Sequence, residues 1–395
     1  MLSDFNPASH VRRAVKRTAR PASTVTQPAA VCTPQLVVLD YHSLQAGDDL
    51  TPQVLQAFGK GGLGLCAVRG IPELQKVRRQ LLPLALKLGS FPAKVLNKYE
   101  LPETSYCFGW SRGREKFKGV PDTAKGSFYA NPIYDDPADG DEAVRAKYPY
   151  AASRNVWPSE LPELEHAFKE AGRLMYEAAQ PLVKQCDALV AAAYPEHTTA
   201  LHSKTFTNSR LALGRLLHYY PGKEDSWCGW HNDNSVITGL LPAMWFDSET
   251  QEEVTDMDTE AGLHVQGRDG AIQRVAVPKD CMIFQVGEAA QIISGGVLRA
   301  TPHFVRGHTS RPGEPQVSRE TFALFMEPHW DAMIGPPRGS SYEDIIHEEE
   351  TELLPPLSKR LKPNPDTGLV EFGKFLGDSF QEYYKHNNPP IEASL

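Results

Sequence analysis

In the first part of the chain, short apolar runs alternate with segments of helical period. The runs at 35–41 and 63–70 have the length and composition of buried strands. After each of them, apolar residues recur at helical spacing, over 50–58 and from 71 to about 88. This order of strand, helix, strand and helix predicts a mixed α/β region.

The longest helical signal runs from 161 to about 194. Its apolar stripe consists of Leu164, Phe168, Met175, Leu182, Cys186 and Leu189. The stripe predicts that Met175 and Cys186 are core residues, and Pro181 is expected to kink or divide the helix. The preceding stretch, 89–158, is rich in glycine, proline and aromatic residues, and it fits either a packed irregular lid or a binding surface.

From 211 to 326 the pattern changes to short apolar runs separated by turns. The runs are LGRLLHYYP, SVITGLL, AGLHVQ, IQRVAV, CMIFQV, QIIS, HFVRG and ETFALFME. Many short strands with turns between them predict a sandwich or barrel. We expect the acidic insert at 246–260 to be a solvated loop. We expect the chain after 336 to be Pro-rich and then helical around 370–384.

Charge, hydrophobicity and cysteine content argue against a nucleic-acid-binding, membrane-spanning or disulfide-rich protein. A net charge of −8 opposes a nucleic-acid binder held by a broad basic surface. No apolar run approaches the roughly 18 residues of a transmembrane helix. Six scattered cysteines without a C-x-x-C motif favour a reducing compartment, so we expect a cytoplasmic protein. The Arg-rich segment 1–34 fits a disordered basic tail, or a transit segment that directs the chain to an organelle.

The segment WCGWHNDNSVITGLL contains the most specific chemical signal. His231 and Asp233 are two residues apart, so on a strand they share a face and can reach one metal ion. His303, which opens the apolar run HFV, is the preferred third ligand over His264 and His308. Two histidines and one carboxylate form the facial triad of non-haem Fe(II) oxygenases. The alternative is a polar turn at HNDNS with no metal.

A second pair of residues suggests an anion site. Arg319 and Thr321 share a strand face, and a guanidinium presented from inside a strand needs an anion. A guanidinium, which can donate two parallel hydrogen bonds, together with a neighbouring hydroxyl suits a small dicarboxylate. The alternative is a salt bridge between Arg319 and an acidic residue of the protein itself. Tyr220, in LLHYYP, either reaches the same anion or is a core tyrosine.

These motifs, in this order, resemble the isopenicillin-N-synthase-like branch of the 2-oxoglutarate- and Fe(II)-dependent dioxygenases, in a plant or algal type of sequence. The similarity includes VVLDYHSL, LQAFGKGGLGLCAVRGIPE and VPKDCMIFQVGEAAQIISGGVLRATPHFV, and it covers about 35–330. Thr321 stands where serine is commoner, His218 where many relatives have asparagine, and Glu288 where many have aspartate. The spacing between the metal ligands is also longer than usual, which the acidic insert explains.

The resemblance implies an α+β, mainly β fold. Its core is a distorted double-stranded β-helix, the jelly roll of clavaminate synthase, with flanking helices. The expected layout is the basic tail 1–34, an α/β region at 35–200 and the jelly roll at 201–330, with a Pro-rich segment and C-terminal helix at 331–395.

The resemblance also implies the cofactors and the reaction. His231, Asp233 and His303 would hold Fe(II), and 2-oxoglutarate would chelate the iron while its far carboxylate meets Arg319, Thr321 and Tyr220. With O2, such an enzyme oxidises a C–H bond of a small organic molecule, by default through hydroxylation, and releases succinate and CO2. We expect a monomer with no nucleic-acid or membrane partner.

Three alternatives stay open at this point. The first is an oxidase of the same fold that does not use 2-oxoglutarate, and the second is a non-catalytic metal-binding or interaction protein. Zinc hydrolysis is the third, although the general-base context it needs is missing from the sequence. A nucleic-acid demethylase is opposed by the acidic charge.

Overall fold

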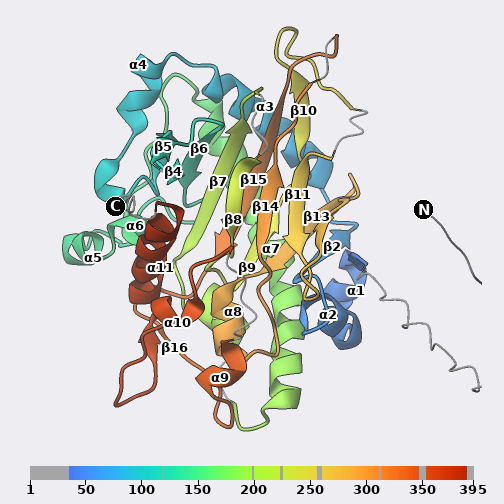
Figure 1. Ribbon diagram of the computed structural model, residues 1–395, viewed down its shortest axis with the longest axis vertical. Helices are drawn as coiled ribbons and strands as arrows, with labels where there is room; N and C mark the ends of the chain where they lie inside the picture. The colour runs from blue at the N-terminus through green and yellow to red at the C-terminus, as the bar shows by residue number, and fades with distance from the viewer. Residues whose placement is uncertain are drawn as a thin grey trace, which may run out of the picture. The chain divides into compact units, whose positions relative to one another are not determined.

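Two β-sheets form the centre of the chain in the computed structural model, which describes residues 35–117, 119–197, 200–222, 226–255, 260–310, 313–346 and 353–388 (Figure 1). The described residues form one compact unit. The expected basic tail, 1–34, lies outside the described residues. None of the described helices is both long enough and apolar enough to cross a membrane.

The N-terminal region has the predicted order of elements. Strand β1 (Val37–Asp40) runs parallel to β2 (Leu65–Arg69), and helices α1 (Tyr41–Ala46) and α2 (Thr51–Phe58) connect them. Helix α3 (Leu74–Gly89) follows β2. The predicted mixed α/β character of this region is confirmed.

The larger sheet has nine strands, in the order β1-β2-β13-β9-β15-β7-β6-β3, with β10 also paired to β15. Beyond β1 and β2 its members are β3 (Gly109–Arg112), β6 (Lys125–Ala130), β7 (Ala212–Tyr219), β9 (Ile237–Leu240), β10 (Met244–Asp247), β13 (Cys281–Val286) and β15 (Val317–Met326). Apart from the pair β1-β2, these strands are antiparallel to their neighbours. Strand β15 therefore lies centrally, between β9 and β7.

The smaller sheet has the order β12-β11-β14-β8. Its strands are β8 (Ser226–His231), β11 (Gly262–Gln266), β12 (Ile272–Arg274) and β14 (His303–Arg306). Its inner face packs on the larger sheet, because Trp227 and Val305 share a buried cluster with Leu217, Tyr219 and Ala323. The functional residues below lie between these two sheets.

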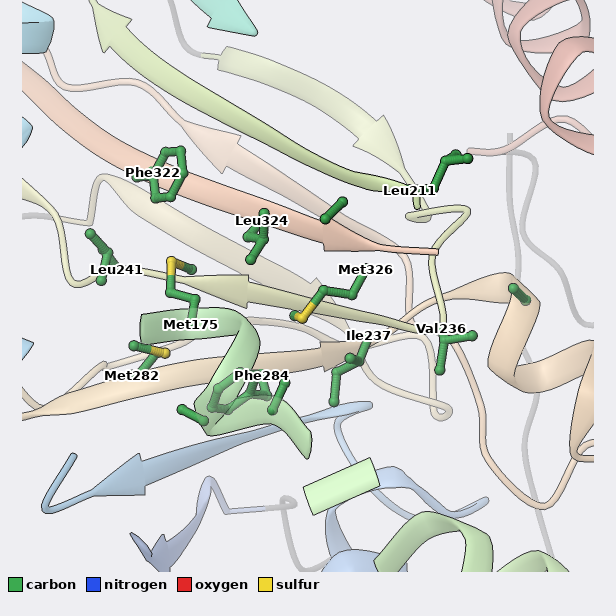
Figure 2. Packing of buried hydrophobic residues seen from close by; sticks show 14 of the residues in the cluster. Met175, Leu211, Val236, Ile237, Leu241, Met282, Phe284, Phe322, Leu324 and Met326 are labelled. Carbon is green, nitrogen blue, oxygen red and sulfur yellow. The ribbon is translucent and has the colours of Figure 1, made fainter. Parts of the chain in front are cut away.

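Helices cover the outer face of the larger sheet. Helix α7 (Glu163–Ala193) carries the predicted stripe, and its buried Met175 lies beside β9 and β13 (Figure 2). Phe322, Leu324 and Met326 of β15 point to this side. Met175 and Cys186 are buried, as predicted, but Pro181 does not divide the helix, which continues through it.

The aromatic stretch after α3 contains short elements. These are α4 (Ala93–Leu96), the 3-10 turns η1 (Asn97–Tyr99) and η2 (Pro102–Thr104), β4 (Lys116–Phe117), β5 (Val120–Pro121), α5 (Glu142–Lys147) and α6 (Pro149–Ala152). Strands β3 and β6 from this stretch extend the larger sheet beyond β7. A π-helical turn, η3 (Ser203–Thr207), precedes β7.

One predicted strand is wrong. The run QIIS belongs to helix α8 (Glu288–Ile293), whose side chains are all buried. A short run buried on every side has no periodic signal that separates a helix from a strand. The C-terminal part consists of β16 (Met333–Ile334), α9 (Tyr342–Ile345), α10 (Leu357–Arg360), β17 (Val370–Glu371) and the predicted helix, α11 (Phe372–Asn387).

Candidate metal centre and its two cavities

The structure brings His231, Asp233 and His303 together. His231 ends β8 and His303 begins β14, and the two residues face each other in the ladder between these strands. Asp233 Oδ1 lies 3.7 Å from the Nε2 atom of each histidine. One ligand atom from each of the three residues lies within 4.8 Å of the others, so a single metal ion can contact all three.

Strand pairing explains why His303, and not His264, joins this group. On the neighbouring strand β11, Val265 is the partner of His303, whereas His264 is the partner of Phe304. Directly paired residues share a sheet face and successive residues alternate, so His264 points away from the metal ligands. It is buried against Phe304, with its Nδ1 atom 3.0 Å from Gly262 O.

Backbone carbonyls orient both histidine rings. His231 Nδ1 lies 2.8 Å from Gly229 O, and His303 Nδ1 lies 3.1 Å from Thr301 O. A proton on each Nδ1 leaves the Nε2 lone pair directed at Asp233, which is the metal-binding tautomer. Burial, with the neighbouring His231, lowers the pKa of His303 to about 4, so its ring is neutral near pH 7.

The loop that carries Asp233 is held by C-terminal elements. Asn232 N donates to the hydroxyl of Tyr383 on α11 (3.0 Å), and Asn232 Nδ2 donates to Glu288 Oε1 (3.0 Å). Glu288 N in turn donates to Asp233 O (2.8 Å). The Glu288 carboxylate is paired with Arg360, and both side chains are only 1% exposed. Glu288 therefore links α8 and α10 to the loop that carries Asp233. From the sequence, this residue had been distinguished only because many relatives have aspartate at its position.

A cavity of about 240 Å³ opens on one side of the three ligands. Arg319 and Thr321 line it, and Arg319 Nη1 is buried without a hydrogen-bond partner among the described residues. The Arg319 guanidinium carbon lies 5.3 Å from the Tyr219 ring centre and 5.9 Å from that of Trp245. Burial lowers the pKa of Arg319 because its charge is desolvated. A buried donor without a partner beside a candidate metal site is suited to an anionic ligand.

Tyr220 does not lie in this cavity, which corrects the position expected for it. Its hydroxyl donates to Gly89 O (2.9 Å), and its ring stacks under Arg112. The neighbouring Tyr219 lines the cavity in its place. Tyr219 is the ladder partner of Arg319, so the two side chains share a face, and the alternation along β7 sends Tyr220 to the other side. Thr321 lines the cavity as expected, with its hydroxyl donating to Leu241 O (3.0 Å).

A larger cavity, of about 600 Å³, also borders the candidate metal site, where His231 and Asp233 line it and His303 does not. The residues common to both cavities are Arg215, Cys228, His231, Asp233 and Phe325. Helix α11 contributes Leu376, Phe380 and Tyr384 to its wall, and the aromatic stretch contributes Tyr106 and Tyr129. That stretch thus lines a cavity. The candidate metal site lies where the two cavities meet.

Arg215 and Glu327, two charged residues of the larger cavity, were not identified from the sequence. Arg215 donates from Nε to Ser127 Oγ (3.0 Å) and pairs through Nη2 with Glu115 (3.2 Å). Glu327 follows β15 and is 6% exposed. Burial, with Asp233 nearby, raises the pKa of Glu327 to about 8. The signal that could have located Glu327 was the alternation along β15, because Arg319, Thr321, Ala323, Phe325 and Glu327 are two residues apart and all line a cavity.

Comparison with solved structures finds the same fold in proteins described as 2-oxoglutarate- and Fe(II)-dependent oxygenases. A 2OG-Fe(II) oxygenase family protein of Caulobacter crescentus matches with a TM-score of 0.60 and 18% identity, over 89% of this chain and 100% of the other. A full-length Neurospora crassa protein, solved in complex with alpha-KG, matches with a TM-score of 0.58 and 16% identity, over 86% of this chain and 94% of the other.

JOX2, solved in complex with 2OG, Fe and JA, matches with a TM-score of 0.58 and 17% identity, over 89% of this chain and 87% of the other. No protein-family model and no curated protein matches the sequence. At these identities the likeness shows the fold, and the chain has the fold of these oxygenases.

Proposed function

We propose that this protein is an Fe(II)- and 2-oxoglutarate-dependent dioxygenase that oxidises, and by default hydroxylates, a C–H bond of a small organic molecule. The observation that carries the proposal is that His231 and Asp233, which form a candidate metal site with His303, line two adjoining cavities. Arg319, whose buried Nη1 has no partner among the described residues, lines one cavity, and the other is larger and has several aromatic residues in its wall. We interpret the two facing sheets as the distorted jelly roll of this class.

The donor set suits Fe(II). Two neutral imidazoles and one carboxylate leave coordination positions open, as in non-haem iron oxygenases. His231 and His303 would each bind through Nε2, because their Nδ1 atoms face carbonyl oxygens. Asp233 would supply the single negative charge, and its side chain is only 5% exposed.

The smaller cavity suits 2-oxoglutarate. Arg319 would pair with the far carboxylate of this co-substrate, with Tyr219 and Thr321 on the same face of the sheet. The buried Arg319 Nη1 supports this assignment, since it lacks any other partner among the described residues. Iron and 2-oxoglutarate together supply the oxidising chemistry from O2, with succinate and CO2 as by-products. The protein orients both organic molecules and separates them from water.

The test is an anaerobic titration of the metal-free protein with Fe(II) and 2-oxoglutarate, followed by optical absorption. We expect a visible charge-transfer band that requires both additions. Asp233→Ala should abolish the band, whereas Asp280→Ala, a change at an exposed carboxylate, should preserve it. If Fe(II) binds but 2-oxoglutarate produces no band, the oxidase that does not use 2-oxoglutarate becomes the better description. If Fe(II) does not bind, the metal assignment is refuted.

A further inference from the structure

Glu327 is a buried acid whose side chain makes no hydrogen bond or ion pair among the described residues. Its neighbour Met326 ends β15, and the backbone Glu327 N donates to Leu211 O (3.3 Å). The side chain lines the larger cavity although the residue is only 6% exposed. A carboxyl group removed from water to this extent requires a cation or a hydrogen-bond donor to be stable as an ion. The missing partner is therefore expected in the cavity itself.

The other charged residues of this cavity already have partners or contact water. Arg215 pairs with Glu115, Arg114 with Glu100, and Lys385 with Glu382. Lys116 is exposed. Asp233 belongs to the candidate metal site. Among the described lining residues, Glu327 thus remains as the buried acid without a partner, and a cationic ligand is the kind that would stabilise its ionised form.

The walls of the cavity favour the same kind of ligand. Its aromatic lining residues are Tyr106, Tyr129, Trp230, Phe325, Phe380, Tyr383 and Tyr384. Aromatic faces attract cations through their quadrupole, and a carboxylate beside aromatic rings is a common environment for bound amines. Leu213 and Leu376 add apolar surface for the rest of such a molecule. The volume of about 600 Å³ suits a small organic molecule.

We propose that the larger cavity binds a substrate with a protonated amine on an apolar or aromatic body, and that Glu327 pairs with the ammonium group. This inference rests on the proposed function in taking the cavity as the substrate site. Arg319 lies near the start of β15 and Glu327 directly follows its end, eight residues further along the chain. This segment would thus present a cation to an anionic co-substrate and an anion to a cationic substrate. A carboxylate substrate would instead meet Glu327 as a like charge.

The test uses three probes with one phenyl body: phenethylamine, phenethyl alcohol and phenylacetate. Their binding to the full chain is measured by isothermal titration calorimetry at pH 7, with Mn(II) and 2-oxoglutarate present to prevent turnover. We expect the amine to bind at least about tenfold more tightly than the alcohol, since hydrogen bonds between charged groups stabilise complexes by about 1.5 to 3 kcal/mol. Phenylacetate should bind most weakly.

Matched variants separate the charge of Glu327 from its packing. Glu327→Gln should weaken amine binding at least about tenfold and change alcohol binding less than about threefold. Glu327→Asp, which keeps the charge, should retain the preference for the amine even if Glu327→Gln folds poorly. Asp280→Asn is the control, because Asp280 is an exposed carboxylate that does not line this cavity.

The outcomes distinguish this inference from the proposed function. An amine that fails to bind at millimolar concentration, or binds no better than the alcohol, overturns the inference. A preference that survives in Glu327→Gln also overturns it. If the amine preference depends on Glu327 but Fe(II) and 2-oxoglutarate do not bind in separate titrations, the amine site stands and the dioxygenase assignment fails. If both cofactors bind and the amine preference is absent, the dioxygenase assignment stands and the amine site is refuted.

Discussion

Replacing Arg319 by methionine separates ligand binding from fold stability at the smaller cavity. The substitution keeps an apolar stem of similar length and removes the charge. Arg319 Nη1 has no hydrogen-bond partner among the described residues, and burial lowers the pKa of the guanidinium. The charge therefore contributes little to the ligand-free fold, and we expect the free energy of unfolding to change by less than about 1 kcal/mol.

The same substitution should strongly weaken 2-oxoglutarate binding. Truncating one partner of a buried charge pair costs about 2 to 5 kcal/mol, much of it from the charge that is left unpaired. At about 1.4 kcal/mol per factor of ten, the lower limit corresponds to a dissociation constant raised roughly thirtyfold. Calorimetric titration of the Mn(II)-loaded protein with 2-oxoglutarate measures this constant, and urea unfolding of the metal-free protein measures stability.

Two arginines of the same cavity serve as controls. Arg274 lines the cavity but is exposed, so Arg274→Met should leave the dissociation constant within about threefold. Arg78 is buried and donates to Pro242 O and Ala243 O, both at 2.7 Å. Arg78→Met should therefore destabilise the fold, in contrast to Arg319→Met. A change of less than about threefold in 2-oxoglutarate affinity for Arg319→Met would refute the assignment of Arg319 as the anion partner.

Three further predictions concern the surroundings of the site. Burial raises the pKa of Glu327 from 4.5 to about 8. In the metal-free protein, the contribution of this carboxyl to the free energy of unfolding should therefore be fully present below about pH 4.5. It should fall by up to about 5 kcal/mol as the pH rises to 8. Urea unfolding of Glu327→Gln should lack this component of the pH dependence, and an identical profile would contradict the assignment. Tyr219→Phe should weaken 2-oxoglutarate binding severalfold and Tyr220→Phe should not, as measured by calorimetry. The opposite ranking would show that Tyr220, and not Tyr219, contacts 2-oxoglutarate. Arg360→Ala should lower the free energy of unfolding by about 3 to 5 kcal/mol by leaving Glu288 buried and unpaired, and the double variant with Glu288→Gln should recover part of that loss. Additive effects in urea unfolding would contradict the pairing.

Local sequence patterns determined several features of this protein. The spacing of Arg319 and Thr321 placed this pair on one strand face before any tertiary information, and both lie on β15. The spacing of His231 and Asp233 identified the pair, but only His231 lies on β8, because the strand ends there and Asp233 belongs to the loop that follows. The apolar stripe that includes Met175 determined the long helix and its buried side. These features depend on the period of the backbone, which is a property of neighbouring residues.

Tertiary structure decided which face of each strand looks into the space between the sheets. Tyr219 and Tyr220 are equally suitable from sequence, and only the pairing of β7 with β15 assigns Tyr219 to the cavity. The helix that contains the run QIIS could not be predicted from the sequence, because its residues are buried on all sides and periodicity then carries no information.

The larger cavity depends most on tertiary structure. Its walls come from the aromatic stretch before α5, from the strands beside the metal ligands and from α11, and these segments are far apart in the sequence (Figure 1). Glu327 has no motif of its own, and its chemistry follows from its burial beside Asp233. The sequence by itself determined the candidate metal ligands and the candidate anion partner, because these depend on residue type and local spacing. The cavity that would select the substrate was decided by long-range packing, because no local pattern encodes which distant side chains exclude water together.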